Sequence, residues 1–242
     1  MKKIIELLKK DKRLLIVLYF PFYMVWFELL EHRKIPVFII HSALDDYIPF
    51  VKEFIIPYMM WFGYVVIILL LLAIKPQKVL PIKNKGAFKL FYSSEIADFY
   101  KCSLALIIGM TFSLIVYTVF PNGLNLRPAD FKVTDYLTGV IMGLYKTDTS
   151  TNVCPSLHVY NSLVVNYSFC KSKGVNALNR TLKLILQTLS NILCILICLS
   201  TMFIKQHSII DVICAIALFI IMYFIIYSKN SYLGGKINGT ER

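Results

Sequence analysis

The chain contains few charged residues. Asp, Glu, Lys and Arg make up only 17% of its 242 residues, whereas hydrophobic residues make up 57%. The mean hydropathy is +0.66, and ordinary soluble domains are about 25% charged. This shortage of charge excludes a soluble globular domain of the usual kind and indicates a protein that lies mostly in a membrane.

The six cysteines lack the spacings that mark a disulfide framework or a metal site. Most lie within or beside long apolar runs, where a thiol behaves as a small hydrophobic group. Internal repeats are absent too, and the first apolar run lacks the small-residue cleavage site of a signal peptide. We therefore expect no metal and no cofactor, and a single membrane domain over residues 1–230 with a polar tail at 231–242.

Six apolar runs approach or reach the length needed to cross a bilayer, which takes about 20 mostly apolar residues. They cover residues 14–31, 54–74, 97–120, 156–171, 181–204 and 207–227. The fourth run is short and carries four polar residues, Asn161, Ser162, Asn166 and Ser168. Polar residues in a span usually face the bundle interior, as those of an active-site helix would. The predicted fold is an all-α polytopic membrane bundle of about six transmembrane helices.

Acidic residues are scarce: the chain has 14, against 26 basic residues, and its net charge is +12. With six spans, most basic residues fall on one side of the bilayer, in residues 1–13, 75–96 and 171–183 and in the tail. This asymmetry predicts cytoplasmic termini and an outward-facing site. Basic residues spread over separate loops fit anionic lipid better than nucleic acid. Short inner loops without a second domain are typical of a bacterial plasma-membrane protein, and nothing in the sequence specifies an oligomeric state.

Two of only four histidines lie in short motifs, each at the start of an apolar run. The first motif is Cys154-Pro155-Ser156-Leu157-His158. Proline suits the first position of a helix, and the free N–H groups at a helix start bind anions such as phosphate. We expect the Ser156 hydroxyl to add a donor there and His158 to lie one turn into the helix. The alternative is a helix cap with an incidental histidine.

The second motif runs from Lys205 through His207 to Asp211. A spacing of four residues puts His207 and Asp211 on one helix face. An ionised carboxylate inside an apolar run is costly unless it is paired. A paired carboxylate fixes the imidazole tautomer and raises its basicity, as in a catalytic triad. The alternative is a structural His–Asp pair that ties helices together.

A third candidate is Arg127, followed by Pro128 just outside a predicted span. A guanidinium group can bind two phosphate oxygens at once, although an Arg in this position can also be a lipid headgroup anchor. The order Arg-Pro, then Pro-Ser-x-His, then His-x-x-x-Asp on one membrane face is far more specific than any one piece.

Over residues 120–215, this ordered set resembles the type-2 phosphatidic acid phosphatase / haloperoxidase superfamily. The motifs of that family are Lys, six residues, Arg-Pro; then Pro-Ser-Gly-His; then Ser-Arg, five residues, His, three residues, Asp. The resemblance implies that His207 is a nucleophile that attacks phosphorus, that Asp211 orients it and that His158 protonates the leaving oxygen. The phosphoryl oxygens would be held by Arg127, Ser156 and the N–H of Leu157. The implied enzyme is a metal-independent lipid phosphatase acting on a phosphomonoester or diphosphate, such as phosphatidic acid or an isoprenyl diphosphate.

The chain departs from the family pattern at three positions. Phe120 replaces the Lys of the first motif, Thr201 replaces the Arg of the third, and Leu157 replaces the Gly of the second. We hypothesise that Lys205 supplies one of the two missing cations. The Pro-Ser-Leu-His form resembles the inositol-phosphotransferase and sphingolipid-synthase branch, which implies transfer of a phospho-headgroup between lipids as an alternative. A non-catalytic binder or a transporter is a further alternative.

Several residues outside these motifs have open roles. Asp45, Asp46 and Glu53 in an outer loop could bind a divalent ion or an acceptor hydroxyl, or form salt bridges in a solvated loop. Glu28, within the first predicted span, is expected to make a helix-packing contact. Residues 136–144 are mildly amphipathic and could lie in the interface. Aromatic residues near span ends are expected to be interface anchors, namely Trp26, Tyr58, Trp61 and Tyr117.

Overall fold

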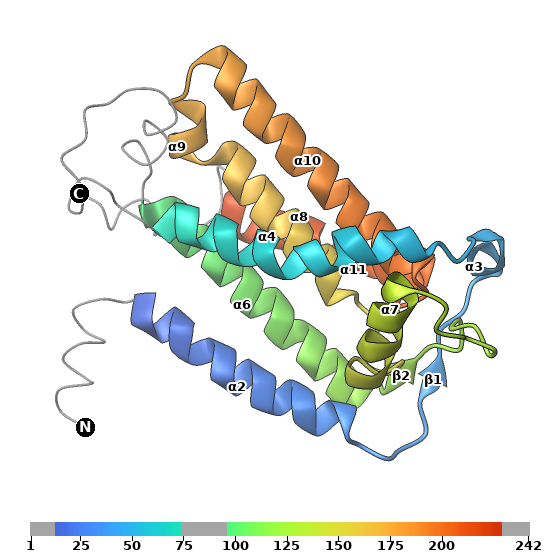
Figure 1. Cartoon of the computed structure of the whole chain (residues 1–242). Coiled ribbons are helices and arrows are strands. Elements are labelled where there is room, and N and C mark those ends of the chain that lie inside the picture. The colour runs from blue at the N-terminus through green and yellow to red at the C-terminus, as the bar shows by residue number, and fades with distance from the viewer. Residues whose placement is uncertain (1–12, 74–95, 229–242) are drawn as a thin grey trace.

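The computed structural model describes residues 13–73 and 96–228. Nearly all of its regular structure is helical, so the predicted all-α class is confirmed (Figure 1). The long helices are α2 (Arg13–Glu31), α4 (Ile55–Ala73), α6 (Ile96–Val119), α8 (Leu157–Lys171), α10 (Arg180–Phe203) and α11 (Ile209–Met222). The predicted basic segments at 1–13 and 75–96, except for Arg13 and Ile96, and the tail at 231–242 lie outside the described residues.

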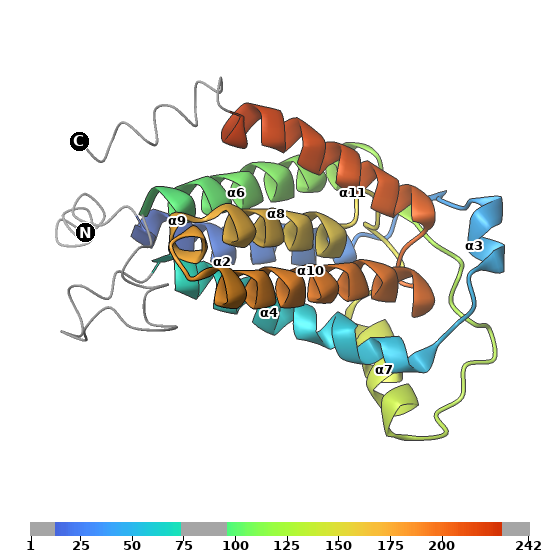
Figure 2. The ribbon, with the colours of Figure 1, turned by 90° about the horizontal axis from the view of Figure 1, so that it is seen from above.

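The short elements are two strands and five helical turns or short helices. They are β1 (Phe38–Ile39), α3 (Ala43–Tyr47), η1 (Lys52–Phe54), β2 (Asn122–Gly123), α7 (Tyr136–Thr147), α9 (Lys173–Asn176) and η4 (Tyr223–Tyr227). The long helices run side by side, and the chain reverses direction between successive ones (Figures 1 and 2). As a result, α3, α7, β1 and β2 gather at one end of the bundle (Figure 1).

Four helical segments are long and apolar enough to cross a membrane. They are Lys52–Ala73, Ile96–Val119, Arg180–Phe203 and Ile209–Tyr227. All four expose large hydrophobic side chains, and helices suit the bilayer because their backbone polar groups bond internally. The chain is therefore of the membrane type, with four candidate spans in the part that the structure describes. The two other predicted runs, 14–31 and 156–171, also form helices, as α2 and α8.

Helix α8 lies at the centre of the bundle, where it packs against α4, α6, α10 and α11 (Figure 2). Its polar residues face other helices, as expected. Asn161, Ser162 and Ser168 are buried. Ser168 shares a hydrogen bond with Tyr227 (2.5 Å), and Asn166 accepts one from the hydroxyl of Ser190 (2.7 Å). This polarity makes α8 weak as a span but suits it to the interior.

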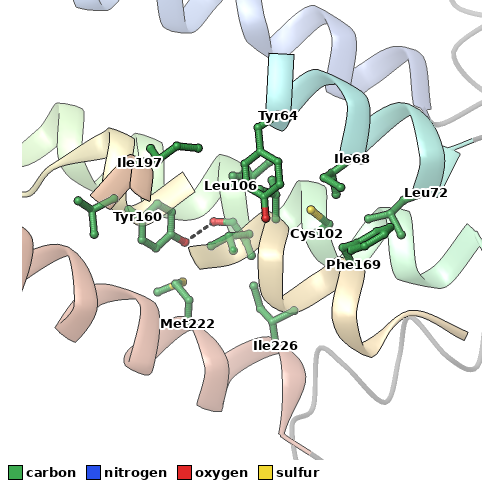
Figure 3. Close-up of a cluster of buried hydrophobic side chains, with 14 of the residues drawn as sticks. Tyr64, Ile68, Leu72, Cys102, Leu106, Tyr160, Phe169, Ile197, Met222 and Ile226 are labelled. Atoms are coloured by element: carbon green, nitrogen blue, oxygen red, sulfur yellow. Dashed lines mark hydrogen bonds between the residues drawn. The ribbon is translucent and has the colours of Figure 1, made fainter. Parts of the chain in front are cut away.

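A glycine lets α6 and α8 approach closely. A Cβ atom on Gly109 would lie 2.1 Å from the ring of Tyr160, far inside van der Waals contact. The hydroxyl of Tyr160 donates to the carbonyl of Ala105 one turn earlier on α6 (2.6 Å) (Figure 3). This contact fixes the position of α8 relative to α6, and with it the position of the first histidine motif at the start of α8.

The end of the bundle that carries the short elements is held by a buried asparagine. Strand β1 pairs with β2 in parallel, and Asn122 of β2 is fully buried. Its side-chain oxygen accepts the N–H groups of Val153 (2.9 Å) and Cys154 (2.8 Å). Since Cys154 opens the first histidine motif, these bonds position that motif against the end of α6.

Candidate active site

The second histidine motif forms a tight turn between α10 and α11. Lys205 adopts a positive φ of 55°, and the N–H of His207 donates to the carbonyl of Thr201 (3.0 Å). Ser208 caps α11, and Oδ2 of Asp211 accepts the N–H of Ser208 (2.8 Å). The same oxygen lies 3.3 Å from Nδ1 of His207. His207 precedes the helix, so the prediction that the pair shares a helix face is wrong; a turn and a capping box bring the two side chains together.

The first motif forms the start of α8. Ser156 is the N-cap residue, and its buried hydroxyl accepts the N–H of Val159 (3.4 Å). Pro155 was expected at the first helical position, but it precedes the cap because the serine hydroxyl takes the capping role. The N–H of Ser156 donates to the carbonyl of Asp211 (3.2 Å). The N-terminus of α8 therefore lies directly beside the second motif.

Leu157 occupies the first position of α8, and its side chain is buried. It packs in a hydrophobic cluster with residues of α2 and α6: Tyr23, Leu30, Leu114 and Tyr117. This packing accounts for a large apolar residue where the family motif has glycine. Because the side chain is packed away, the part of Leu157 left to hold a phosphoryl oxygen, as predicted, is its backbone N–H at the helix N-terminus.

His158 lies within an aromatic enclosure. The rings of Tyr58 and Trp61, one turn apart on α4, have their centroids 4.5 Å and 4.4 Å from the centroid of His158. The centroid of the His207 ring lies 5.8 Å from that of His158. The two histidines, separated by the whole of α8, α9 and α10 in sequence, are therefore neighbours in space.

Arg127 is held beside this pair by several contacts. Its guanidinium group donates to the carbonyls of Tyr145 (3.0 Å) and Asp148 (2.6 Å) and to the side-chain oxygen of Gln206 (2.5 Å). The same group stacks on the ring of Tyr145, 4.3 Å from its centroid. Burial lowers the pKa of Arg127, but a guanidinium remains charged in proteins. Because Gln206 directly precedes His207, this network places the predicted cation next to the predicted nucleophile.

Lys205 makes a different set of contacts. Its ammonium group donates to the backbone carbonyls of Asp45 (2.9 Å) and Ile48. Within the described part of the chain, no hydrogen bond or ion pair joins it to Arg127 or to either motif histidine. It lines a pocket of about 390 Å³ with His41, Asp45, Asp46, Asn125 and Leu126. The structure thus brings together Arg127, His158, His207 and Asp211, with Ser156 and Leu157 at the adjoining helix start, but does not bring Lys205 into that group.

The residues at the two positions where the family motifs have a cation, Phe120 and Thr201, make apolar or backbone contacts. Phe120 packs its ring on Phe38 at 5.3 Å between centroids and is 45% exposed. Thr201 is fully buried, and its hydroxyl donates to the carbonyl of Cys198 (2.8 Å). Among the described residues, Arg127 is the one side-chain cation with a hydrogen bond to Gln206, the residue before His207.

Sequence reasoning missed three residues of this site. Asp148 follows α7, and its carboxylate accepts the hydroxyl of Tyr58 (2.9 Å) and lies 3.5 Å from the side-chain nitrogen of Gln206. Burial raises the pKa of Asp148, and Tyr58, His207 and Arg127 partly offset that effect. Tyr58 was expected to be an interface anchor but is fully buried. The available signal was position: Asp148 lies in the polar segment leading into the first motif, and Gln206 adjoins His207.

Two of the three acidic candidates in the outer loop have partners in the described part of the chain. Asp45 is buried and accepts the hydroxyl of Ser208 (2.6 Å) and the N–H of Ile209 (2.8 Å). Asp46 instead pairs with His41 (2.8 Å). No three His, Cys, Asp or Glu side chains are grouped as a metal site requires in the residues described, so the divalent-ion alternative for this loop is not supported.

Two further expectations are corrected by the contacts of α2 and α6. Glu28 is exposed and pairs with His32 on its own helix (3.4 Å), rather than packing against another helix. Tyr117, expected at the interface, is buried and donates to the carbonyl of Pro155 (2.6 Å). Both errors arise because a sequence shows distance from a span end but not which way a side chain points.

Comparison with protein-family models, with curated proteins and with solved structures gave no match. A base paired with a carboxylate, a second imidazole close to it, one guanidinium group and a free helix N-terminus are together suited to nucleophilic attack on an anionic phosphorus centre.

Proposed function

We propose that this chain is an integral membrane lipid phosphatase that hydrolyses a phosphomonoester or diphosphate headgroup through a phosphohistidine intermediate. The observation that carries the proposal is the meeting of three separate sequence motifs: His207 lies 3.3 Å from Asp211 and 5.8 Å, ring to ring, from His158, and Arg127 is bonded to the residue before His207. The resemblance to the type-2 phosphatidic acid phosphatase superfamily points to the same chemistry.

In the first proposed step, Nε2 of His207 attacks phosphorus and the bond from phosphorus to the lipid oxygen breaks. Asp211 holds Nδ1, which keeps Nε2 free as the nucleophile. His158 gives its proton to the leaving lipid oxygen. In the second step, His158 takes a proton from water, the oxygen of that water attacks phosphorus, and the phosphorus–nitrogen bond breaks to release phosphate.

Charge on the phosphoryl oxygens would be stabilised by fixed donors. Arg127 retains an Nε–H that has no hydrogen-bond partner among the described residues. The N-terminus of α8 adds backbone N–H groups and the positive end of the helix dipole. Such preorganised donors stabilise developing charge because they need no reorganisation during the reaction.

We propose that the membrane domain has six spans: the four candidate segments and, in addition, α2 and α8. The termini would be cytoplasmic and the site would face outward in a bacterial plasma membrane. Support comes from the distribution of basic residues in the sequence and from the alternating direction of the helices (Figure 1). Accessibility of a single cysteine introduced at the exposed Asn125 to a membrane-impermeant thiol reagent, in intact cells, tests the orientation.

A second candidate function is transfer of a phospho-headgroup to a lipid alcohol, with the alcohol in place of water in the second step. One observation favours it: among the described residues, Arg127 is the one side-chain cation hydrogen-bonded to Gln206, the residue before His207, and a single cation suits a phosphodiester with one negative charge. The Pro-Ser-Leu-His form of the first motif resembles the transferase branch as well.

The test is phosphate release from the detergent-solubilised protein supplied with phosphatidic acid or isoprenyl diphosphate in EDTA, beside the His207→Ala variant. Release that persists in EDTA and is lost in the variant supports the phosphatase. Transfer of a labelled headgroup to diacylglycerol or ceramide, without phosphate release, supports the second candidate. Absence of both reactions in the folded wild-type protein contradicts the enzymatic proposal.

A further inference from the structure

Asp148 connects the parts of the site, although it belongs to none of the sequence motifs. It follows the last residue of α7, and its N–H donates to the carbonyl of Leu144 (2.8 Å). Its own carbonyl accepts Nη2 of Arg127 (2.6 Å), and its carboxylate accepts the hydroxyl of Tyr58 (2.9 Å). The side chain is only partly exposed. Asp148 thus binds Arg127 through its backbone carbonyl and Tyr58 through its carboxylate.

The partners of Asp148 each support one element of the proposed chemistry. Tyr58 stacks on His158 at 4.5 Å. The side chain of Gln206 lies between the Asp148 carboxylate (3.5 Å) and Arg127 (2.5 Å), directly before His207. A change at Asp148 therefore reaches Arg127 directly, His158 through Tyr58, and His207 through the preceding residue.

The charge of Asp148 also bears on the ligand. The titratable and charged groups that face it are Tyr58 from α4, Glu31 from α2, Arg127 from the loop before α7 and His207 from the turn before α11. Of these, Arg127 is the one permanent cation, and Asp148 lies against it. Charges within a partly buried site are weakly screened. A second negative charge on a ligand would meet the carboxylate of Asp148 without a second permanent cation among these groups to offset it.

We propose that Asp148 is a positioning residue that makes the site prefer singly charged phosphoryl groups, either phosphodiesters or phosphomonoesters in their singly protonated form, over groups of higher charge. The inference rests on the proposed function, because it takes the histidine site to be a phosphoryl site. It ranks phosphodiester lipids above doubly charged phosphomonoesters as substrates, and so favours the donor that headgroup transfer would use.

The experiment compares two small probes at pH 8, where dimethyl phosphate carries one negative charge and methyl phosphate carries two. Their dissociation constants for the full chain in a maltoside detergent are measured by phosphorus NMR line broadening. The variant is Asp148→Asn, which keeps the shape and an acceptor for Tyr58 but removes the charge. Asp148→Glu retains the charge, and Asp46→Asn removes a carboxylate that pairs with His41 instead of contacting this network.

We expect the wild-type protein, the Asp148→Glu variant and the Asp46→Asn control to bind dimethyl phosphate at least about tenfold more tightly than methyl phosphate. In Asp148→Asn the ratio should fall to below about threefold, mainly through tighter binding of methyl phosphate. A structural role alone would weaken both probes together. If Asp148→Asn does not fold, Asp148→Ser removes the same charge with a smaller side chain.

The outcomes separate the inference from the proposed function. Wild-type binding of both probes with no preference for the singly charged one, or an unchanged ratio in Asp148→Asn, overturns the role of Asp148 and leaves the phosphoryl site standing. Failure of both probes to bind the folded wild-type protein contradicts the phosphoryl site itself, and the proposed function with it.

Discussion

Arg127 and Lys205 are both basic and both close to Gln206: Arg127 contacts it in space, and Lys205 precedes it in sequence. Their side chains nevertheless bind different parts of the molecule. Arg127 binds Gln206 and two loop carbonyls and stacks on Tyr145, which leaves it beside the histidines. The ammonium group of Lys205 is bound to the carbonyls of the α3 loop. The difference shows that closeness in sequence to a nucleophile does not make a cation part of its site; the direction of the backbone turn does.

The group of residues around Arg127 and His207, rather than the surroundings of Lys205, should account for the chemistry. His207→Ala tests this most directly. Loss of the nucleophile should lower phosphate release, or headgroup transfer, by at least about 10³-fold. The measurement is the initial rate in detergent with the lipid substrate that the wild-type protein accepts. His41→Ala is the matched control, since His41 is an exposed histidine at the Lys205 pocket, and it should retain activity. Comparable losses of activity in His207→Ala and His41→Ala would contradict the assignment of the chemistry to His207.

The second largest effect is expected at Arg127. Arg127→Lys keeps the charge but loses the planar group that binds several oxygens and stacks on Tyr145, so kcat/KM should fall by about 10²-fold. Arg33→Lys is the control, because Arg33 also donates to backbone carbonyls, those of Tyr117 and Thr118, but away from the histidines. Full activity of Arg127→Lys would show that charge alone is sufficient at this position.

On the Lys205 side, the expected effect is on stability. Asp45 is 1% exposed, and its carboxylate accepts bonds from Ser208 and Ile209 at the start of α11. Asp45→Asn should lower the free energy of unfolding by about 1–3 kcal/mol, because an amide group cannot accept all of these bonds. Denaturant unfolding in detergent measures it. Asp46→Asn, with a side chain that is 64% exposed, should change stability by less than about 0.5 kcal/mol; equal losses would refute the structural role of Asp45.

The smallest effect is expected for Lys205→Ala, with kcat/KM within about threefold of wild type, because the ammonium group is bound to backbone carbonyls rather than at the histidines. Lys205→Gly should be more stable than Lys205→Ala by about 1 kcal/mol, since φ is 55° there and glycine adopts that region without strain. Thermal unfolding and lipid kinetics of the two variants provide the comparison. A loss of activity near that of Arg127→Lys would instead restore Lys205 as the second phosphate cation.

The helices could be predicted because their signal is local. The run at 97–120 corresponds to α6 (Ile96–Val119), and the run at 181–204 to α10 (Arg180–Phe203), since length and hydropathy suffice to identify such elements. The polar residues of 156–171 also predicted an interior helix, because unpaired polar groups are costly in lipid. Helix starts were less accurate: Ser156 and Ser208 take the capping positions, which moves Pro155 and His207 outside the helices that the sequence predicted for them.

Composition and motif order thus specified an apolar helical chain and named the residues that meet: Arg127, His158, His207 and Asp211. Tertiary structure alone decided their surroundings. Asp148 and Tyr58 are 90 residues apart along the chain, and no local pattern links a carboxylate after one short helix to a hydroxyl within a long one. Likewise, the turn at Lys205 determines which carbonyls its ammonium group reaches. Such contacts depend on how helices pack and how loops fold over their ends, and these follow from the whole chain rather than from any segment of it.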